Sequence, residues 1–438
     1  MDRDAHELAR TLVRRVAVVG AGWAGLASAV EATEAGAQVT LFDMAPEAGG
    51  RARTLGGRGN GDMVLDNGQH ICIGAYTETL RLLARVGVAE SQVFLRMPLT
   101  LVDAAGEGLR LGRGAPLPAF ALAVLRRHGW RWHDRLALLR TAARWRRQGF
   151  RCAPTATVDE LCASLPACVR EDFIEPLCIA ALNTSAAEAS GAVFLRVLND
   201  ALATGPGSAD LLLPRIDLGA VFPVPALAWL QRAGAVVRLG ERVNHLAATG
   251  TGTWSVDGTA FDRVVVAASA VEAARLVGQF MPEWAARASA LRYEPIVTVY
   301  ARSDGARLPE PMLTLRSDAD RPAQFVFDRG RLGGPAGLLA LVASGASAWL
   351  HRGLVETERA ALAQARHALS SHLHAPLEAV RTIVEKRATF ACTPALVRPA
   401  ATVHPFLFAA GDYVEGPYPA TLEGAVRSGV AAARAAMA

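Results

Sequence analysis

Lysine is almost absent from this chain of 438 residues, because Lys386 is the only lysine among 46 basic side chains. Arginine therefore makes nearly every cationic contact, and its planar guanidinium suits bidentate contacts to phosphate or carboxylate. The abundance of alanine and glycine indicates a simpler cause, the codon usage of a GC-rich genome. The shortage of lysine alone therefore assigns no function.

Paired cysteines are also missing. The chain has six cysteines, and none of them forms a Cys-x-x-Cys pair. This spacing excludes the common zinc sites and a thioredoxin-like redox motif. In a chain of this length the cysteines are predicted to be reduced, buried thiols, and no metal site is expected.

The chain also lacks long apolar runs and a signal segment. The longest apolar stretches, such as residues 117–125, are far shorter than the roughly 20 residues that a membrane span needs. The N-terminal residues carry acids and no apolar core before Val16, unlike a secretory signal. With 51% hydrophobic and 20% charged residues, a disordered chain is excluded. These features predict a folded protein in a cytoplasmic setting.

The positive charge is concentrated in one segment. Residues 121–151 hold nine arginines and one aspartate, a local charge of +8 in a chain whose formal net charge is +5. The rest of the chain therefore carries −3. This distribution excludes a diffusely basic protein and leaves one basic segment to explain.

A nucleotide-binding pattern opens the chain. Residues 16–19 form a short apolar run, as expected for a parallel strand that is buried on both faces. The run enters Gly20-Ala21-Gly22-Trp23-Ala24-Gly25. A helix of small residues is then predicted over 26–35 and a second strand over 39–42, which ends at Asp43. Strand, turn, helix and acid together predict a dinucleotide-binding unit.

Each glycine of the turn has a separate role in such a unit. Gly20 permits the tight turn, Gly22 lets the backbone approach a pyrophosphate, and Gly25 lets the helix pack on the strand. The free N–H groups of the helix N-terminus face the phosphates, and Asp43 binds a ribose hydroxyl. Trp23 and Ala24, which lie between these glycines, are included in the predicted cofactor site.

A second glycine pair follows Asp43, in Met44-Ala45-Pro46-Glu47-Ala48-Gly49-Gly50-Arg51-Ala52-Arg53-Thr54. It would bring further backbone and two guanidinium groups near a pyrophosphate and an isoalloxazine ring, which a plain NAD dehydrogenase does not need. The two motifs together resemble the glutathione-reductase-like flavoproteins, in their amine oxidase and phytoene desaturase branch. The resemblance implies FAD as the cofactor, with Asp43 on the adenosine ribose and Gly49, Gly50 and Arg51 along the cofactor.

Two distant segments extend this resemblance to essentially the whole chain. Short strands are predicted over residues 240–243, 254–256 and 261–268, and later over 406–410, with a helix over 421–432. The resemblance implies the roles of the remaining cofactor residues, which are Val243 on the adenine, Gly411 and Asp412 on the ribityl or pyrophosphate, and Thr421 and Leu422 at a helix N-terminus beside the flavin. A helix N-terminus favours the negative charge of a reduced flavin.

A narrower resemblance comes from the run Leu65-Asp66-Asn67-Gly68-Gln69-His70-Ile71-Cys72-Ile73-Gly74-Ala75-Tyr76. The other segments that carry it are residues 22–26, 175–177, 183–184, 210–214, 385–390 and 411–418. Together they resemble the squalene-associated family of flavoproteins. The resemblance implies a long-chain isoprenoid substrate, hydroxysqualene, whose hydroxyl is replaced by hydrogen in the last step of a bacterial squalene route that feeds hopanoid synthesis.

Such chemistry sets requirements that the sequence can be searched for. An allylic alcohol loses its hydroxyl through a stabilised cation that takes a hydride from reduced flavin, so an acid and a dry pocket are needed. The polar residues beside the predicted flavin segments are His70, Asp66 and Tyr418, with Tyr413 and Glu415 as further candidates. His70 is the first choice as the acid, although it could equally be a core histidine or a flavin contact.

Other flavoprotein functions stay open at this point. An amine oxidase commonly has a lysine near the flavin, and Lys386 could supply it, but no clear aromatic cage accompanies it. A carotenoid or phytoene desaturase would use the flavin in the oxidising direction on a similar chain. A flavin-binding protein without catalysis is the remaining alternative. The electron donor is unidentified, because the chain has no second dinucleotide fingerprint.

The basic segment, residues 117–151, is predicted to contact a membrane surface. On a helix, Leu138, Ala142 and Trp145 fall on one side, with several arginines opposite. Arginine and tryptophan beside apolar residues are typical of an interfacial helix. A solvated domain face is the main alternative, and no nucleic-acid module accompanies the segment. We expect peripheral association with the inner face of the cell membrane. Gly129 leaves open whether the segment is one helix or two.

The predicted fold is α/β, a glutathione-reductase-like Rossmann FAD-binding domain with an inserted mixed α+β substrate domain. The FAD-binding domain is assigned to residues 11–105, 205–275 and 395–438. The substrate domain takes 106–204, predicted to be mainly helical, and 276–394, with strands over 296–300, 324–327 and 338–342, a helix over 356–374 and a strand over 387–390.

Overall fold

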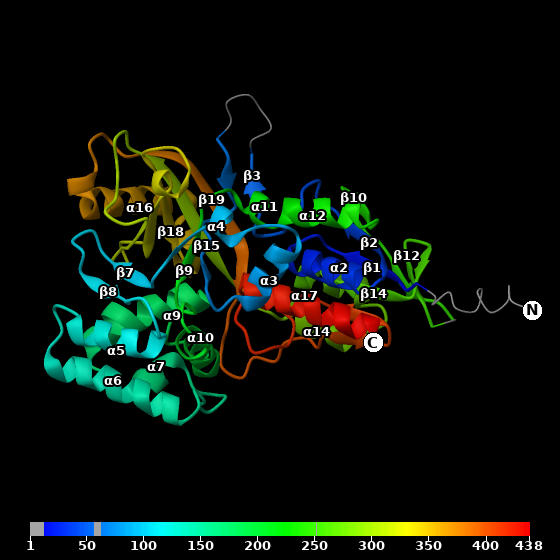
Figure 1. Ribbon diagram of the computed structural model, residues 1–438, viewed down its shortest axis with the longest axis horizontal. Coiled ribbons are helices and arrows are strands. Elements are labelled where there is room, and N and C mark those ends of the chain that lie inside the picture. The colour runs from blue at the N-terminus through cyan, green and yellow to red at the C-terminus, as the bar shows by residue number, and fades with distance from the viewer. Residues whose placement is uncertain (1–12, 57–62, 251) are drawn as a thin grey trace, which may run out of the picture.

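The computed structural model describes residues 13–56, 63–250 and 252–438 (Figure 1). The first twelve residues, where the sequence showed no secretory signal, lie outside the described part of the chain. All six cysteines lie within it as free thiols. Among the described helices, none is long and apolar enough to cross a membrane.

A six-stranded sheet gathers strands from the beginning, middle and end of the chain. Its order is β10 (Val236–Leu239), β2 (Gln38–Asp43), β1 (Arg15–Val19), β14 (Arg263–Val266), β21 (Leu407–Ala409) and β20 (Thr402–His404). The first five strands are parallel, and β20 is antiparallel to β21. The three predicted cofactor segments thus meet in one sheet, and the predicted fold class is confirmed.

Helices cover both faces of this sheet, as the apolar composition of β1 requires. Val16 and Val18 pack in one core with α2 (Trp23–Glu34), α12 (Pro223–Arg232) and α17 (Leu422–Met437). Ala17 and Val19 pack in another core, which includes residues of α13 (Ala270–Val277) and α14 (Pro282–Ser289). A three-stranded antiparallel sheet lies beside the helices, formed by β11 (Leu246–Ala248), β12 (Trp254–Val256) and β13 (Thr259–Phe261).

A second large sheet, five-stranded and antiparallel, forms one side of the inserted region. Its order is β16 (Met312–Thr314), β17 (Phe325–Asp328), β18 (Leu338–Ala343), β15 (Tyr293–Arg302) and β19 (Glu378–Phe390). Helices α15 (Ser347–Arg352) and α16 (Leu354–Ala368) follow β18, and residues of α16 pack in the core of this sheet. A smaller sheet, with the order β5 (Cys72–Ile73), β9 (Leu211–Pro214) and β6 (Phe94–Met97), adjoins it.

Residues 116–203 form a helical layer at one end of the molecule, away from both described termini (Figure 1). Its members are α5 (Pro116–Arg126), α6 (Trp132–Arg147), α7 (Val158–Cys162), α8 (Ala167–Val169), a π-helical turn (Arg170–Ile174), α9 (Glu175–Leu182) and α10 (Gly191–Ala203). The remaining short elements are β3 (Thr54–Leu55), β4 (Leu65–Asp66), α3 (Thr77–Arg85), α4 (Glu90–Val93), β7 (Thr100–Val102), β8 (Gly108–Arg110), α11 (Leu218–Val221) and two 3₁₀ turns (Gly330–Leu332, Ser370–His372).

Two predicted elements are wrong in detail. The strand expected over residues 240–243 is a loop, because β10 ends at Leu239 and Gly240 turns the chain with φ of 77°. The helix expected over 356–374 ends at Ala368. The structure also resolves the basic segment into two helices, since Gly129 adopts φ of 79° between α5 and α6.

Candidate active site

One cavity of about 640 Å³ runs from the first glycine-rich turn to the space between the five-stranded sheet and the helical layer. At one end it is lined by the predicted cofactor residues, which are Gly20, Gly22, Trp23, Ala24, Asp43, Gly49, Gly50, Arg51, Val243, Gly411, Asp412, Thr421 and Leu422. At the other end its lining is apolar and includes Ile71, Leu99, Phe120, Phe173, Leu177, Leu198, Ile296, Met312, Phe325 and Phe327. A polar, glycine-rich site and an apolar chamber are therefore continuous.

The glycines of the first turn meet different steric limits. A Cβ on Gly25 would lie 1.7 Å from the Gly20 carbonyl oxygen, and one on Gly20, where φ is 113°, would lie 2.5 Å from the Ala267 carbonyl oxygen. A Cβ on Gly22 would meet nothing closer than the Gly50 Cα, at 3.8 Å. Gly25 and Gly20 are thus required by packing, whereas Gly22 keeps space open. Gly25 is the one predicted cofactor glycine that does not line the cavity.

Asp43 lines the cavity at the carboxyl end of β2. Its carboxylate accepts hydrogen bonds from the backbone N–H of Ala21 at 2.6 Å and of Ala45 at 2.7 Å. These bonds tie the acid at the end of β2 to the glycine turn. Val243 lies in the loop after β10, where its carbonyl accepts a hydrogen bond from the Arg275 guanidinium at 2.7 Å.

Trp23 and the second glycine pair form the wall beyond the turn. The Trp23 indole donates to the Ala52 carbonyl at 3.0 Å and packs on Phe222, with ring centroids 5.1 Å apart. Gly49 bonds through its N–H to the Ala21 carbonyl at 2.8 Å, which holds the second glycine motif against the first. The two motifs that are adjacent in sequence therefore border one site.

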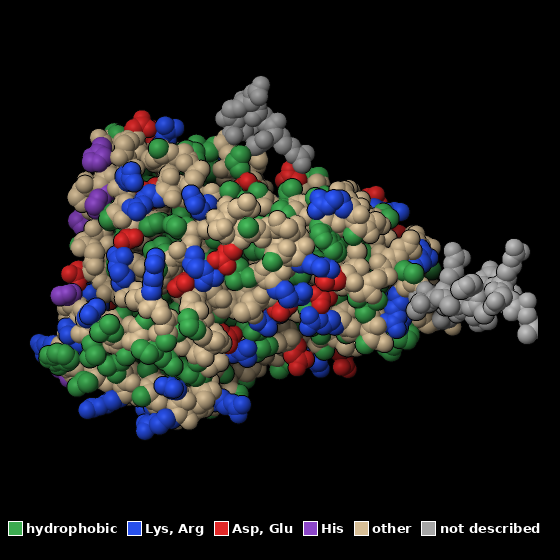
Figure 2. Space-filling view, in the orientation of Figure 1, with side chains coloured by type: hydrophobic (Ala, Val, Ile, Leu, Met, Phe, Trp, Pro, Cys, Tyr) green, Lys and Arg blue, Asp and Glu red, His purple; other side chains and the backbone are tan. Residues whose placement is uncertain are grey.

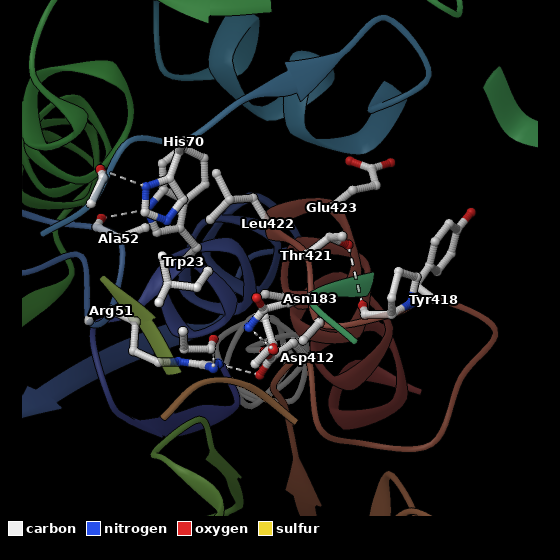
Figure 3. A pocket seen from close by; sticks show the side chains of 18 of the residues that line it. Trp23, Arg51, Ala52, His70, Asn183, Asp412, Tyr418, Thr421, Leu422 and Glu423 are labelled. Atoms are coloured by element: carbon white, nitrogen blue, oxygen red, sulfur yellow. Dashed lines mark hydrogen bonds and ion pairs between the residues drawn. The ribbon is translucent and has the colours of Figure 1, made fainter. Parts of the chain in front are cut away.

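Arg51 and Asp412 form an ion pair across the cavity wall (Figure 3). Arg51 also donates to the Ala388 carbonyl at 2.8 Å, and Arg398 donates to the backbone carbonyl of Asp412 at 3.1 Å. Tyr293 lines the cavity nearby, and burial, with the charge of Asp412, raises its pKa to about 12. Tyr293 was not identified from the sequence, since no local motif marks a tyrosine at the start of a sheet strand.

Helix α17 presents its N-terminus to the cavity. Thr421 caps the helix by accepting a hydrogen bond from the Gly424 N–H at 3.0 Å, and Leu422 lines the cavity. Glu423, a residue that the sequence analysis missed, is buried and accepts hydrogen bonds from the N–H groups of Glu78 and Thr79 at 3.0 and 2.9 Å. Its carboxylate therefore joins the start of α17 to the start of α3.

His70 lies in the cavity wall on the same side as Trp23 (Figure 3). Its Nδ1 is 3.1 Å from the Gly68 carbonyl oxygen. A carbonyl can only accept, so Nδ1 carries a proton, and in the neutral ring Nε2 is left as an acceptor. Burial lowers the pKa of His70 below its usual value.

The other acid candidates lie in different environments. Asp66 is not among the cavity-lining residues, because its carboxylate turns to the Leu218 N–H at 2.8 Å, and burial raises its pKa to about 6. Tyr418 lines the cavity, and its hydroxyl accepts from Arg196 at 2.9 Å. Tyr413 also lines the cavity and is buried, and its hydroxyl has no hydrogen-bond partner among the described residues. Glu415 is exposed and lies outside the cavity lining.

Asn183, at the C-terminus of α9, is a second polar residue that sequence reasoning assigned no role. It adopts φ of 50° and is buried beside the cavity. Its amide donates to the Thr389 hydroxyl at 2.8 Å and accepts from the Gly345 N–H at 2.6 Å. Asn183 thus links the helical layer to the five-stranded sheet across the apolar chamber.

The parts of this site fit FAD. The open face of Gly22 and the N-terminus of α2 suit a pyrophosphate, Asp43 suits a ribose, and the N-terminus of α17 suits the anionic side of a flavin. The sheet and the site together define a flavin-dependent oxidoreductase. The model of the flavin containing amine oxidoreductase family matches residues 23–437, and the chain belongs to that family.

Individual relatives and structures agree with this assignment. The chain is 29% identical to a hydroxysqualene dehydroxylase of Rhodopseudomonas palustris, over 96% of this chain and 97% of that protein. It is 32% identical to a zeta-carotene desaturase of Solanum lycopersicum, but over only 24% of this chain and 18% of that protein. The solved structure of an oxidoreductase from Methanosarcina mazei matches with a TM-score of 0.73 and 16% identity, over 95% of this chain and 99% of that one.

Proposed function

We propose that this protein removes the allylic hydroxyl of hydroxysqualene and replaces it with hydrogen, giving squalene, in a bacterial route that feeds hopanoid synthesis. The observation that carries the proposal is the single cavity that joins the FAD site to a long apolar chamber. The relatives that match over almost their whole length and are named hydroxysqualene dehydroxylase support it.

The apolar chamber has a defined task in this reaction. Cleavage of the allylic C–O bond leaves a resonance-stabilised cation, which water would capture. Side chains from the five-stranded sheet, such as Ile296 and Phe327, face those from α9 and α10, such as Leu177 and Leu198, and they exclude water from the chain of the substrate. Reduced FAD, when bound, supplies the hydride that the carbon receives. The electron donor that reduces it is a separate, unidentified partner.

The departing hydroxyl needs a proton, and we assign His70 as its donor. His70 lines the cavity beside the cofactor end, and its Nδ1 proton is held by the Gly68 carbonyl, so the substrate receives a proton from Nε2 only when the ring is fully protonated. The lowered pKa makes the protonated ring a strong acid. Tyr418 is the second candidate among the cavity-lining residues. Asp66 bonds to the Leu218 N–H and does not line the cavity, so among the three candidates it is the least suited to give a proton to the substrate directly.

The decisive experiment is turnover of hydroxysqualene by FAD-loaded protein under a chemical reductant. We expect squalene as the product and reoxidation of the flavin in equal amount. Oxygen consumption with an amine, together with peroxide release, would instead identify an amine oxidase. Desaturation of a carotenoid precursor, which the partial match to zeta-carotene desaturases motivates, would place the chain among desaturases. If the protein binds FAD but catalyses none of these reactions, the proposal is wrong.

The substrate resides in lipid, and we propose that residues 117–151 dock the protein on the inner face of the cell membrane. Figure 2 shows apolar side chains at the α5–α6 end of the molecule with arginines around them. Trp132, Leu136 and Leu122 are 65%, 40% and 46% exposed. Leu138 and Trp145 are buried, so the opposite, arginine-rich side of α6 faces the solvent. Arginine attracts anionic headgroups, and tryptophan suits the interface.

Sedimentation with vesicles tests the docking proposal. We expect the protein to pellet with vesicles that contain phosphatidylglycerol and to pellet less at high salt, because salt screens the arginine contacts. A protein that stays in the supernatant even at low salt would show that α5 and α6 are a solvated face.

A further inference from the structure

Three aromatic side chains separate the apolar chamber from the α5–α6 surface. Phe120 of α5 and Phe173 of the π-helical turn line the chamber, with ring centroids 6.0 Å apart. Trp130, in the connection between α5 and α6, packs edge-on against Phe173 at 6.5 Å and is not a lining residue. All three are buried.

We propose that Phe120, Trp130 and Phe173 form the entry gate through which a linear isoprenoid chain passes between the lipid surface and the chamber. This inference rests on the proposed function for its substrate class. Two exposed apolar side chains follow the gate residues in sequence, Leu122 on α5 after Phe120 and Trp132 at the start of α6 after Trp130. Because residues two apart on a helix point to opposite sides, the single helix α5 separates Leu122 on the surface from Phe120 in the chamber wall.

The gate residues are held by a contact that can be released without unfolding a helix. The Trp130 indole donates to the Asp172 carboxylate at 3.1 Å, and Asp172 precedes Phe173 in the π-helical turn. Asp172 is exposed and Trp130 is buried, so this part-buried bond lies at the boundary between the surface and the interior. A π-turn is a local irregularity that frequently marks a functional position in a helix. Gly129, with φ of 79°, gives the loop before Trp130 a sharp turn.

Loss of the Trp130–Asp172 hydrogen bond or of the aromatic contacts in the gate should have a different effect from a change elsewhere in the chamber wall. Loss of the Trp130–Asp172 bond alters the rates of entry and exit and leaves the equilibrium affinity nearly unchanged, whereas a change at Phe173, which also lines the chamber, alters the rates and the affinity. A change in the chamber wall alters the affinity. The matched variants are Asp172→Ala against Glu171→Ala, both exposed acids of one turn, and Phe173→Leu against Phe327→Leu, both phenylalanines that line the chamber.

The measurement uses the FAD-loaded full chain and diphenylhexatriene, a linear apolar fluorophore, in vesicles of phosphatidylcholine and phosphatidylglycerol. Energy transfer from this probe to the flavin reports occupancy of the chamber in a stopped-flow experiment. We expect Asp172→Ala and Phe173→Leu to speed both uptake and release by about 3- to 10-fold, the factor that loss of one such contact contributes to a rate. Glu171→Ala should behave as the unaltered protein, and Phe327→Leu should change the dissociation constant without faster uptake.

The gate proposal is wrong if the Asp172→Ala and Phe173→Leu variants take up the probe at the same rate as the unaltered protein. It is equally wrong if Glu171→Ala speeds uptake as much as Asp172→Ala, since the effect would then be one of surface charge. Because the probe is not turned over, the outcome is independent of catalysis. Faster uptake without conversion of hydroxysqualene would retain the gate and reject the proposed function, and the converse result would do the opposite.

Discussion

At the scale of single residues, two glycines of the first turn have different roles, because Gly25 is needed for stability and Gly22 for cofactor binding. Gly22→Ala adds a Cβ that meets only the Gly50 Cα at 3.8 Å, so the protein without FAD should unfold at an unchanged temperature. The added methyl enters the space of the pyrophosphate, and FAD affinity should fall at least about tenfold, or about 1.4 kcal/mol. Gly25→Ala should destabilise the protein itself by about 1–3 kcal/mol. Thermal unfolding and flavin fluorescence titration measure the two effects, and loss of stability in Gly22→Ala would contradict this division.

His70 should give the reaction its dependence on pH. The proton donor must be protonated, and burial lowers the pKa of His70, so the rate should be highest in acid and fall as pH rises through a value below about 6.5. His70→Gln should lower kcat about 10²- to 10⁴-fold and remove this dependence. Turnover measured between pH 5 and 8 tests the assignment, with Tyr418→Phe as the control that should retain the pH limb. A Gln variant with an unaltered profile would exclude His70.

Asp66 should make the protein less stable as pH rises. Burial raises the pKa of Asp66 to about 6, so the folded protein binds its proton more tightly than the unfolded chain, whose carboxyl titrates near 4. Raising the pH from below about 4 to above about 6 should therefore cost about 3 kcal/mol of unfolding free energy at this residue. Asp66→Asn still accepts from the Leu218 N–H and should remove that slope in urea unfolding. An equal slope in both proteins would contradict the assignment.

At the scale of elements, α6 should contribute to lipid binding through its exposed side chains. Trp132→Ala removes a 65% exposed indole, and Leu136→Ala should add to its effect. The double variant should lower the partition onto anionic vesicles about tenfold, since burial of apolar area at the interface is lost. Val355→Ala, which truncates a still more exposed apolar residue (84%) on α16, is the control and should bind as the unaltered protein. If both changes act alike, the contact is not specific to α6.

An element could be predicted from the sequence when the residues that determine it lie within a few positions of one another. The strand–turn–helix at the start and the strand before Gly411 follow from apolar runs and glycines that act within a few residues. The sequence predicts a strand at 240–243, but these residues form a loop, because the apolar residues before them belong to β10 and Gly240 ends that strand. The positions of Tyr293, Asn183 and Glu423 in the site depend on contacts with distant residues, and a single sequence carries no local signal for such contacts.

At the scale of the whole molecule, binding of FAD should stabilise the six-stranded sheet, which is assembled from separate segments of the chain. Residues that line the cavity come from β2, from the loop after β10 and from the start of α17, so FAD bound there is expected to contact all three. FAD at 100 times its dissociation constant should stabilise the fold by about 2.7 kcal/mol, and each further tenfold by about 1.4 kcal/mol. Thermal unfolding at increasing FAD concentrations measures this rise. A midpoint that does not move with FAD would contradict a site that spans the three segments.

The order of strands in the six-stranded sheet has a consequence for how the protein is made. Strand β21 lies inside the sheet, between β14 and β20, and α17 packs against α2, yet both belong to the last 32 residues of the chain. On the ribosome, β14 therefore lacks its neighbour β21 until that segment has been made, whereas β1 can already pair with β2 and β14. The flavin pocket therefore cannot be complete before β21 and the start of α17 have been made, and until then the open edge of β14 can pair with other chains.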